Sequence, residues 1–312
     1  MRTWNYEFEV PDQKKVRMIV YTDAKNEADD QFTIAHHLMT PSFLVKGIIA
    51  AHFDKKPRAD MKSDTAQESY EEVCKVMDLM DVAGSVPVIK GSVRGLQNEH
   101  TPNESEAAKF IIEEAMRDDP HPLFIGCMGS VTDLASAILL EPEIQERMTA
   151  IWIGGGDYPQ GGQEFNCGMD IAAANVLMKS KMSLWQVPKC AYKQVSVTLA
   201  MLQKEVRPYG KIGKYLFQQL VEYNMQHADQ LAWPHGESWG LGDDPTVGLL
   251  LVEKEKTDLY DIKEAPIISY EDMSYSFTGA NRKIRVYKDV NARMSLEDMF
   301  AKLQINYPEF AD

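Results

Sequence analysis

Apolar, β-branched runs alternate with helix-like segments between residues 16 and 180, and this alternation is the strongest constraint on the fold. Strand-like runs cover residues 16–23, 44–53, 85–91, 122–128 and 149–156, and helix-like segments cover residues 29–40, 64–82, 105–116, 129–142 and 169–180. Nearly continuous apolar strands that alternate with helices over short links predict a mainly parallel sheet covered on both faces. We therefore predict an α/β protein with a single Rossmann-like domain that spans residues 1–312.

The second half of the chain departs from this alternation. Residues 206–240 are typical of a helical layer and run into the aromatic, polar segment LAWPHGESWGLG. Residues 265–290 predict a few antiparallel strands, because short apolar runs are separated there by turn residues. Residues 294–304 predict a closing helix, in which Ser295 and Asp298 have the spacing of an N-terminal capping pair.

Charge and cysteine content exclude several classes of partner. The chain of 312 residues has 33 lysines and arginines against 47 aspartates and glutamates, a formal net charge of −14. Duplex nucleic acid and anionic membranes bind basic surfaces, so we expect a small-molecule partner, with no nucleic acid and no membrane. No apolar run approaches the ~20 residues of a membrane span. The four cysteines have no CxxC spacing, so we expect reduced thiols and a cytoplasmic protein.

Acidic and amide side chains follow the predicted strands. Open parallel sheets bind ligands beyond the carboxyl ends of their strands. The segment TDAKNEADDQ after the first strand carries Asp23, Asp29 and Asp30, and the loop DYPQGGQEFNCGMD follows the strand at 149–156. The segment GLGDDPTVGLL opens a later helix, with Asp244 in the capping position before a proline.

Two explanations fit these acids. Asp29, Asp30 and Asp244 could each stabilise only a helix N-terminus, for about 0.3–1 kcal/mol apiece. Alternatively, the acids converge around a hard cation, because neighbouring carboxylates repel each other unless a positive charge intervenes. Calcium binds through oxygen ligands alone, whereas zinc favours clusters of histidine and cysteine, which this sequence lacks. A carboxylate beside such a cation could then take a proton from water.

Four segments resemble, in order, the motifs of the inosine–uridine-preferring nucleoside hydrolase family. TDAKNEADDQFTIAHHL resembles its aspartate-rich DxDPGxDD motif, and GSVTDLASAI is similar to its G-x-L-T-N-L-A turn. WIGGGDYPQGGQEFN resembles the M-G-G-G…E-F-N segment, and GDDPTVGLL resembles the H-D-P segment. The resemblance covers residues 16–252. It implies the nucleoside hydrolase fold and calcium-dependent hydrolysis of the N-glycosidic bond of a ribonucleoside or related N-riboside, which gives ribose and free base.

The resemblance assigns roles to individual positions. The Ca²⁺ ligands that it implies are the side chains of Asp23, Asp30 and Asp244 and the backbone carbonyl of Met128. Asp29 would be the catalytic base that activates a water molecule. Glu164 and Asn166 would hold the ribose hydroxyls, and Asp54 falls near the position of a sugar-binding asparagine. Relatives of this family commonly form dimers or tetramers, so the resemblance also implies a homo-oligomer.

Three further residues lie close to these motifs. Asn26 and Glu27 fill an acidic loop that is two residues longer than the common motif, and the pattern TDAxNExDDQ suggests a variant subgroup of the family. They form either a surface turn or a contact with the substrate. His52 ends a strand beside the expected site, where it could contact the substrate or be purely structural.

The expected leaving-group side departs from the family pattern. The histidine of the H-D-P segment, often assigned to protonating the departing base, is Asp243 here. A carboxylate of ordinary pKa is a poor acid at neutral pH. Either crowding raises the pKa of Asp243, or another group assists, or the departing base needs no acid. We consider His235 and Trp239 as residues of the leaving-group region, with ordinary helix-end packing as the alternative.

Two other functions compete with hydrolysis. A non-catalytic sugar- or nucleoside-binding member of the same fold is favoured by the missing histidine and by Tyr21, which replaces the first aspartate of the common motif. The presence of Asp29 beside Asp30 speaks against it, because a pure binder has no use for a base. A metal-dependent phosphatase would also use acids, but the chain has no evident phosphate cradle.

Overall fold

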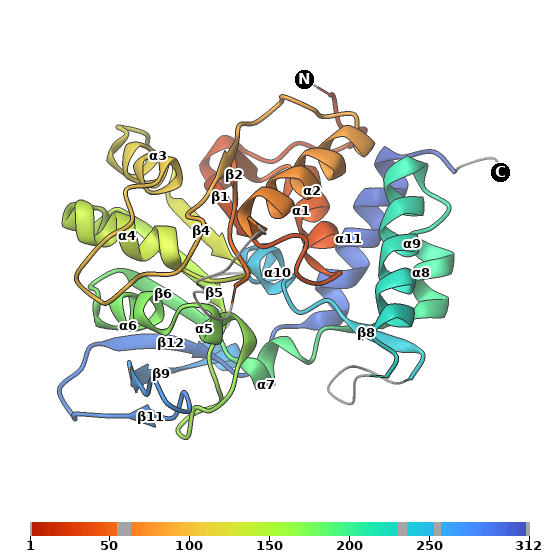
Figure 1. Ribbon diagram of the computed structural model, residues 1–312. Helices are drawn as coiled ribbons and strands as arrows, with labels where there is room; N and C mark the ends of the chain where they lie inside the picture. The colour runs from red at the N-terminus through yellow and green to blue at the C-terminus, as the bar shows by residue number, and fades with distance from the viewer. Residues whose placement is uncertain (1, 55–63, 230–235, 253–256, 310–312) are drawn as a thin grey trace.

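The computed structural model describes residues 2–54, 64–229, 236–252 and 257–309. A twisted sheet runs through its centre in the strand order β3-β2-β1-β4-β5-β6-β12-β9 (Figure 1). Every neighbouring pair is parallel except β12 and β9, which are antiparallel. The strands of this sheet are β1 (Val16–Thr22), β2 (Phe43–Ala50), β3 (Val88–Lys90), β4 (Leu123–Cys127), β5 (Met148–Ile153), β6 (Ser183–Val187), β9 (Tyr260–Glu264) and β12 (Lys283–Tyr287).

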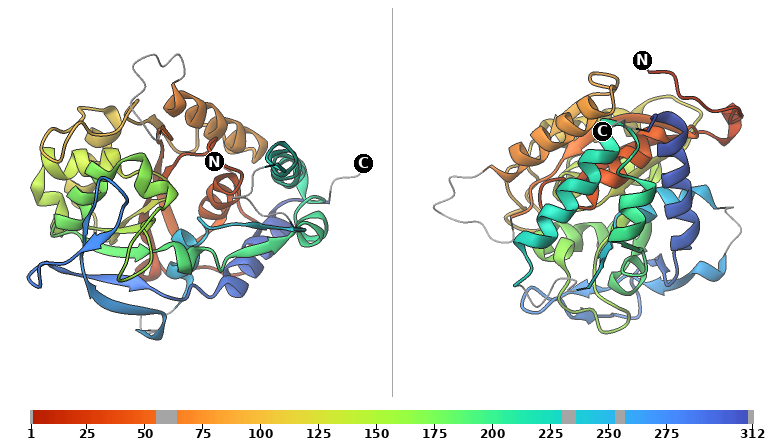
Figure 2. Two further views of the ribbon diagram at one scale, coloured as in Figure 1. Left: turned by 60° about the horizontal axis from the view of Figure 1, so that its bottom comes forward. Right: turned by 90° about the vertical axis from the view of Figure 1, so that its right-hand side faces the viewer.

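Helices cover both faces of the sheet (Figures 1 and 2). The alternation along β1 shows why: Met18 and Val20 pack into one buried apolar cluster, whereas Ile19 and Tyr21 pack into a second on the opposite face. The helices are α1 (Asp30–Met39), α2 (Thr65–Leu79), α3 (Glu106–Met116), α4 (Thr132–Leu140), α5 (Phe165–Met169), α6 (Ile171–Lys179), α7 (Lys189–Tyr192), α8 (Leu199–Glu205), α9 (Gly210–Gln226), α10 (Pro245–Leu251) and α11 (Ala292–Asn306). The prediction of a mainly parallel, doubly covered sheet is therefore confirmed.

The second half of the chain was predicted less well. Residues 265–290 do contain an antiparallel pair, β10 (Ile267–Ile268) and β11 (Tyr275–Ser276). The strand β12 joins the main sheet, where it is antiparallel to β9 but parallel to β6. The last residues of the expected helical layer form β8 (Ser238–Gly240), which pairs antiparallel with β7 (Ser196–Thr198). Pairing with a segment about forty residues away overrides the local helical pattern, because it buries Trp239 against the core.

The strand order places several loops at one edge of the sheet. The order reverses between β1 and β4, which are direct neighbours, so the links after these strands leave the sheet side by side. This is the point at which doubly wound sheets bind their ligands. The loops after β5 and β6 open at the same edge, because all four strands are parallel. None of the helices in the described ranges is long and apolar enough to cross a membrane.

Candidate active site

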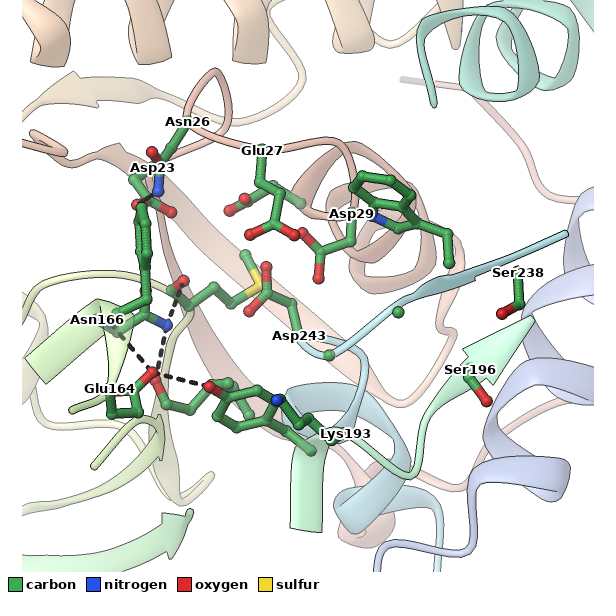
Figure 3. Close-up of a pocket in the computed structure, with 18 residues that line it drawn as sticks. Asp23, Asn26, Glu27, Asp29, Glu164, Asn166, Lys193, Ser196, Ser238 and Asp243 are labelled. Atoms are coloured by element: carbon green, nitrogen blue, oxygen red, sulfur yellow. Dashed lines mark hydrogen bonds between the residues drawn. The ribbon is translucent and has the colours of Figure 1, made fainter. Parts of the chain in front are cut away.

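A cavity of about 430 Å³ lies at this edge, beyond the carboxyl ends of the central strands (Figure 3). Its lining comes from segments far apart in the sequence: the loop between β1 and α1, the residues after β4 and β5, α7 and the β7–β8 ribbon. Six of the residues that line it are acidic, namely Asp23, Glu27, Asp29, Asp30, Glu164 and Asp243. The acids that the sequence placed after separate strands therefore do converge in one pocket.

Three of these acids form a tight group. Asp29, Asp30 and Asp243 each offer a carboxylate oxygen, and these oxygens all lie within 4.8 Å of one another. All three residues are buried. Three carboxylates this close in a poorly solvated site repel each other strongly when ionised. The arrangement is one that a hard, oxygen-binding cation would stabilise.

The pKa values of these three aspartates reflect their burial and crowding. Burial raises the pKa of Asp29 to about 6, an effect that backbone N–H groups of Asp243 and Gly242 partly offset. Burial and then the charge of Asp29 raise the pKa of Asp30 to about 8. Burial, followed by the charges of Asp29 and Asp30, raises the pKa of Asp243 well above its ordinary value. Without a cation, this group therefore holds protons at neutral pH.

Asp23 lies beside this group at the end of β1. Its Oδ2 accepts a hydrogen bond from Asn26 Nδ2 at 2.9 Å, and burial, together with the charge of Asp30, raises its pKa well above the ordinary range. A Cβ atom at Gly129 would come within 2.8 Å of the Asp23 Cγ, so only glycine permits this close approach. The hydroxyl of Thr22, the last residue of β1, donates a hydrogen bond to Asp30. This bond fixes the Asp30 carboxylate against β1.

Asp244 does not line the cavity. Its Oδ1 lies 2.7 Å from His36 Nδ1, and its Oδ2 accepts a hydrogen bond from the Ser295 hydroxyl. Asp244 was expected as a metal ligand, but the structure does not bring it to the acidic group. The adjacent Asp243 lies in that group instead. The expected capping role of Ser295 and Asp298 is wrong for the same reason, because both lie inside α11 and bond to Asp244 and His36.

Glu164 is held rigidly on the opposite side of the cavity. It caps α5: its oxygens accept hydrogen bonds from the N–H groups of Gly155, Asn166 and Cys167 at 2.8–3.1 Å and from the Tyr192 hydroxyl at 3.0 Å. Four donors satisfy most of its acceptor capacity and orient the carboxylate.

Asn166 and Met128 are joined directly. Asn166 Nδ2 donates to the backbone carbonyl oxygens of Met128 at 3.1 Å and Ile153 at 2.9 Å. The carbonyl expected as a metal ligand therefore lies at the cavity wall and accepts a side-chain hydrogen bond. With Nδ2 committed to two carbonyls, the amide oxygen of Asn166 is the atom available to a ligand (Figure 3).

The remaining predicted residues divide into two sets. Asn26, Glu27 and Trp239 line the cavity. His52 and Asp54 do not: His52 Nε2 lies 2.9 Å from Thr132 Oγ1 in the buried core, and Asp54 accepts a hydrogen bond from Thr65. His235 lies outside the described residues.

Sequence reasoning missed a further wall of the cavity. Phe165, Tyr192, Lys193, Ser196 and Ser238 all line it. Phe165 stands between two residues that were predicted, so the loop pattern contained the signal. Tyr192 and Lys193 follow β6, a strand that the sequence pattern did not identify. Had β6 been identified, the rule that ligands bind beyond the carboxyl ends of the strands would have indicated these two residues.

Comparisons with known proteins assign the family. A family profile described as inosine-uridine preferring nucleoside hydrolase matches residues 18–297. The chain belongs to this family. An inosine-uridine preferring nucleoside hydrolase of Leishmania major is 28% identical over 186 residues, which cover 50% of this chain and 59% of that protein. A protein of the same description from Crithidia fasciculata is 28% identical over 106 residues, or 33% of this chain and 34% of that protein. The chain therefore spans less than two thirds of each of these curated relatives.

Solved structures share the fold of this family. A purine-preferring ribonucleoside hydrolase from Gardnerella vaginalis has a TM-score of 0.73 at 17% identity, with 92% of this chain and 98% of that chain covered. The type III effector protein XopQ, complexed with adenosine diphosphate ribose, has a TM-score of 0.64 at 16% identity, with 93% and 94% covered. Identities this low show a common fold and no more. The family is metal-dependent, and a buried acidic group of the required kind is present here.

Proposed function

We propose that this chain hydrolyses the N-glycosidic bond of a ribonucleoside or related N-riboside with the help of Ca²⁺, releasing ribose and the free base. The observation that carries the proposal is the convergence of Asp29, Asp30 and Asp243 in one cavity with Glu164 and Asn166. A helix-capping role explains neither this convergence nor its burial, because the side chains of Asp29 and Asp244 make no capping hydrogen bond.

The donor atoms of the cavity fit a hard divalent cation. Asp23, Asp30 and Asp243 supply carboxylate oxygens, and Met128 adds a backbone carbonyl at the wall. We propose these four residues as the Ca²⁺ ligands, with Asp243 in place of Asp244. Oxygen donors of this kind suit calcium better than zinc. When bound, the cation would hold ribose hydroxyls and lower the pKa of a neighbouring water molecule.

Asp29 is the proposed base. It stands within the acidic group, yet backbone N–H groups of the turn before α10 favour its ionised form, which a base requires. In the reaction, a water proton passes to Asp29 while the water oxygen forms a bond to C1′ of the ribose. The C1′–N bond breaks, and its electron pair leaves with the base.

Glu164 and Asn166 are the proposed sugar contacts. Glycosidic bond breakage builds positive charge on the sugar ring. An oriented carboxylate and an amide oxygen beside that ring favour the charge, because they need no reorganisation when it develops. The fixed geometry of Glu164, with four donors on its oxygens, is the supporting observation.

The proposed leaving-group side is aromatic. Trp239 and Tyr192 contribute rings to the cavity wall and could pack against a planar heterocycle. No histidine lines the cavity in the described part of the chain, so protonation by that residue type is not part of the proposal.

A reducing-sugar assay over a nucleoside panel, combined with metal analysis of the purified protein, tests this function. We expect ribose release that needs Ca²⁺ and falls by about 10²–10⁴ in Asp29→Ala, with the circular dichroism spectrum unchanged. Saturable binding heat without any ribose release would overturn the proposal in favour of a non-catalytic nucleoside-binding protein. The same preparation checks the expected homo-oligomer by light scattering.

A further inference from the structure

One side of the cavity differs chemically from the rest. Lys193 is the only lysine, arginine or histidine among the described residues that line it, in a cavity with six acidic residues. Ser196 and Ser238 line the same side, away from Asp23 and Asn166 (Figure 3). A lone cation and two hydroxyls therefore stand apart from the acidic group.

The backbone holds these three residues in place. Lys193 directly follows α7, and its N–H donates to the Lys189 carbonyl at 3.2 Å. Ser196 and Ser238 belong to the antiparallel β7–β8 ribbon, in which Val197 pairs with the buried Trp239. Burial of that pair fixes the ribbon to the core, so its two serines are presented to the cavity from a stable platform.

The side chain of Lys193 has no partner among the residues that the structure describes. Within the described ranges, no residue forms a hydrogen bond or ion pair with Lys193 Nζ, or a hydrogen bond with the Ser196 or Ser238 hydroxyl. The nearby Lys189, by contrast, donates from Nζ to the Gln163 carbonyl at 3.0 Å. A cation that lines an acidic cavity without pairing to any of its acids remains free to pair with a ligand.

We infer that Lys193, Ser196 and Ser238 bind a carboxylate carried by the departing heterocycle, so that the substrates are N-ribosides with an acidic base. The inference rests on the proposed function, which puts the sugar at Glu164 and Asn166 and the heterocycle beside Trp239. One ammonium group balances one carboxylate, and two hydroxyls add hydrogen bonds to its oxygens. A phosphate dianion would face the same single lysine among six acids, which favours the carboxylate. Lys193 would also stabilise the negative charge that the base acquires as the C1′–N bond breaks.

A matched pair of substrates isolates this contact. 5-Carboxyuridine and 5-carbamoyluridine differ only by a carboxylate against a carboxamide, and uridine 5′-monophosphate tests a phosphate on the sugar. We expect the wild-type protein to prefer the carboxylate by about 10-fold in kcat/KM, and Lys193→Gln to reduce the carboxylate-to-carboxamide ratio by about 10-fold. The control Lys109→Gln removes an exposed charge on α3 and leaves the ratio unchanged.

Equilibrium binding keeps the inference separate from the proposed function. Calorimetry with 5-carboxyuracil and 5-carbamoyluracil needs no turnover, and the same dependence on Lys193 is expected there. If neither riboside is cleaved but this dependence appears, the hydrolase proposal fails, whereas the carboxylate-binding site at Lys193 stands. If both ribosides are cleaved and Lys193→Gln does not change the carboxylate-to-carboxamide ratio of kcat/KM, the inference fails and the hydrolase proposal stands. A preference for the 5′-monophosphate that Lys193→Gln abolishes would also overturn it.

Discussion

His36 Nδ1 lies 2.7 Å from Asp244 Oδ1, and both side chains are fully buried. The contact joins α1, which follows the acidic loop, to the turn that carries Asp243 into the cavity. On its other side, His36 Nε2 lies 2.8 Å from Asp298 Oδ2 of α11. The charge of Asp244, followed by hydrogen bonds to Asp244 and Asp298, raises the pKa of His36 against the opposing effect of burial. One histidine therefore ties three helices together behind the acidic group.

Removal of Asp244 should destabilise the protein strongly. Asp244→Ala leaves His36 and Ser295 without a buried partner, and breaking such a pair costs about 3–5 kcal/mol. Urea unfolding measures this loss. Asp298→Asn is the control, since it retains a hydrogen-bonding side chain that is one third exposed, and it should cost clearly less.

Cation affinity separates the roles of the two adjacent aspartates. Asp243→Asn should weaken Ca²⁺ binding by about 10–100-fold, because a neutral amide oxygen replaces a carboxylate and one negative charge is lost. Titration calorimetry gives the affinity directly. Asp244→Asn is the matched comparison and should change it much less. An equal loss of affinity in both variants would mean that Asp244 reaches the cation after all.

Stability of the metal-free protein should fall as pH rises. The folded-state pKa values of Asp29 and Asp30, about 6 and about 8, exceed their ordinary value of 3.8. Between pH 3.8 and about pH 8, the folded state binds more protons than the unfolded state. The free energy of unfolding therefore decreases as the pH increases. The stabilisation is fully present below pH 3.8 and is lost as the pH passes through 6 and 8.

Thermal unfolding in chelator from pH 5 to pH 9 measures this slope. Saturating Ca²⁺ should flatten or reverse it, because the cation binds the deprotonated carboxylates and releases their protons. Asp30→Asn should also flatten the slope in chelator. Stability that rises with pH in the metal-free wild type would contradict the crowding of these buried carboxylates.

The Tyr192 hydroxyl should contribute to turnover through Glu164. Tyr192→Phe removes the O–H donor 3.0 Å from Glu164 Oε1, while three backbone N–H groups still hold the carboxylate. A charge-assisted hydrogen bond of this kind is worth about 1.5–3 kcal/mol, so kcat/KM should fall by roughly 10-fold or more. The assay is ribose release from a nucleoside.

A second tyrosine provides the control for this variant. Tyr215 donates its hydroxyl to the buried Glu72 outside the cavity, so Tyr215→Phe loses the same kind of bond away from the site. Its kcat/KM should stay near the wild-type value. A similar fall in both variants would point to a general loss of stability and not to the orientation of Glu164.

The mainly parallel character of the sheet, its cover of helices on both faces, and the gathering of Asp23, Asp29 and Asp30 with Glu164 could be predicted from the sequence. Continuous apolar runs report burial on both faces, and parallel strands bring their carboxyl ends to one edge, so residues after different strands must meet there. Both features follow from local sequence: the apolar pattern of each strand, and the identity of the residues that come directly after it.

The choice between Asp243 and Asp244 was decided by tertiary structure alone. Adjacent residues at the start of a helix point in different directions, and their spacing in the sequence does not say which one faces the cavity. That direction depends on His36 and Ser295, which are more than fifty residues from Asp244 on one side or the other. Ser238 likewise comes close to the segment that holds Lys193 and Ser196 only through the pairing of β7 with β8. Local periodicity carries no information about a contact between segments so far apart in the sequence.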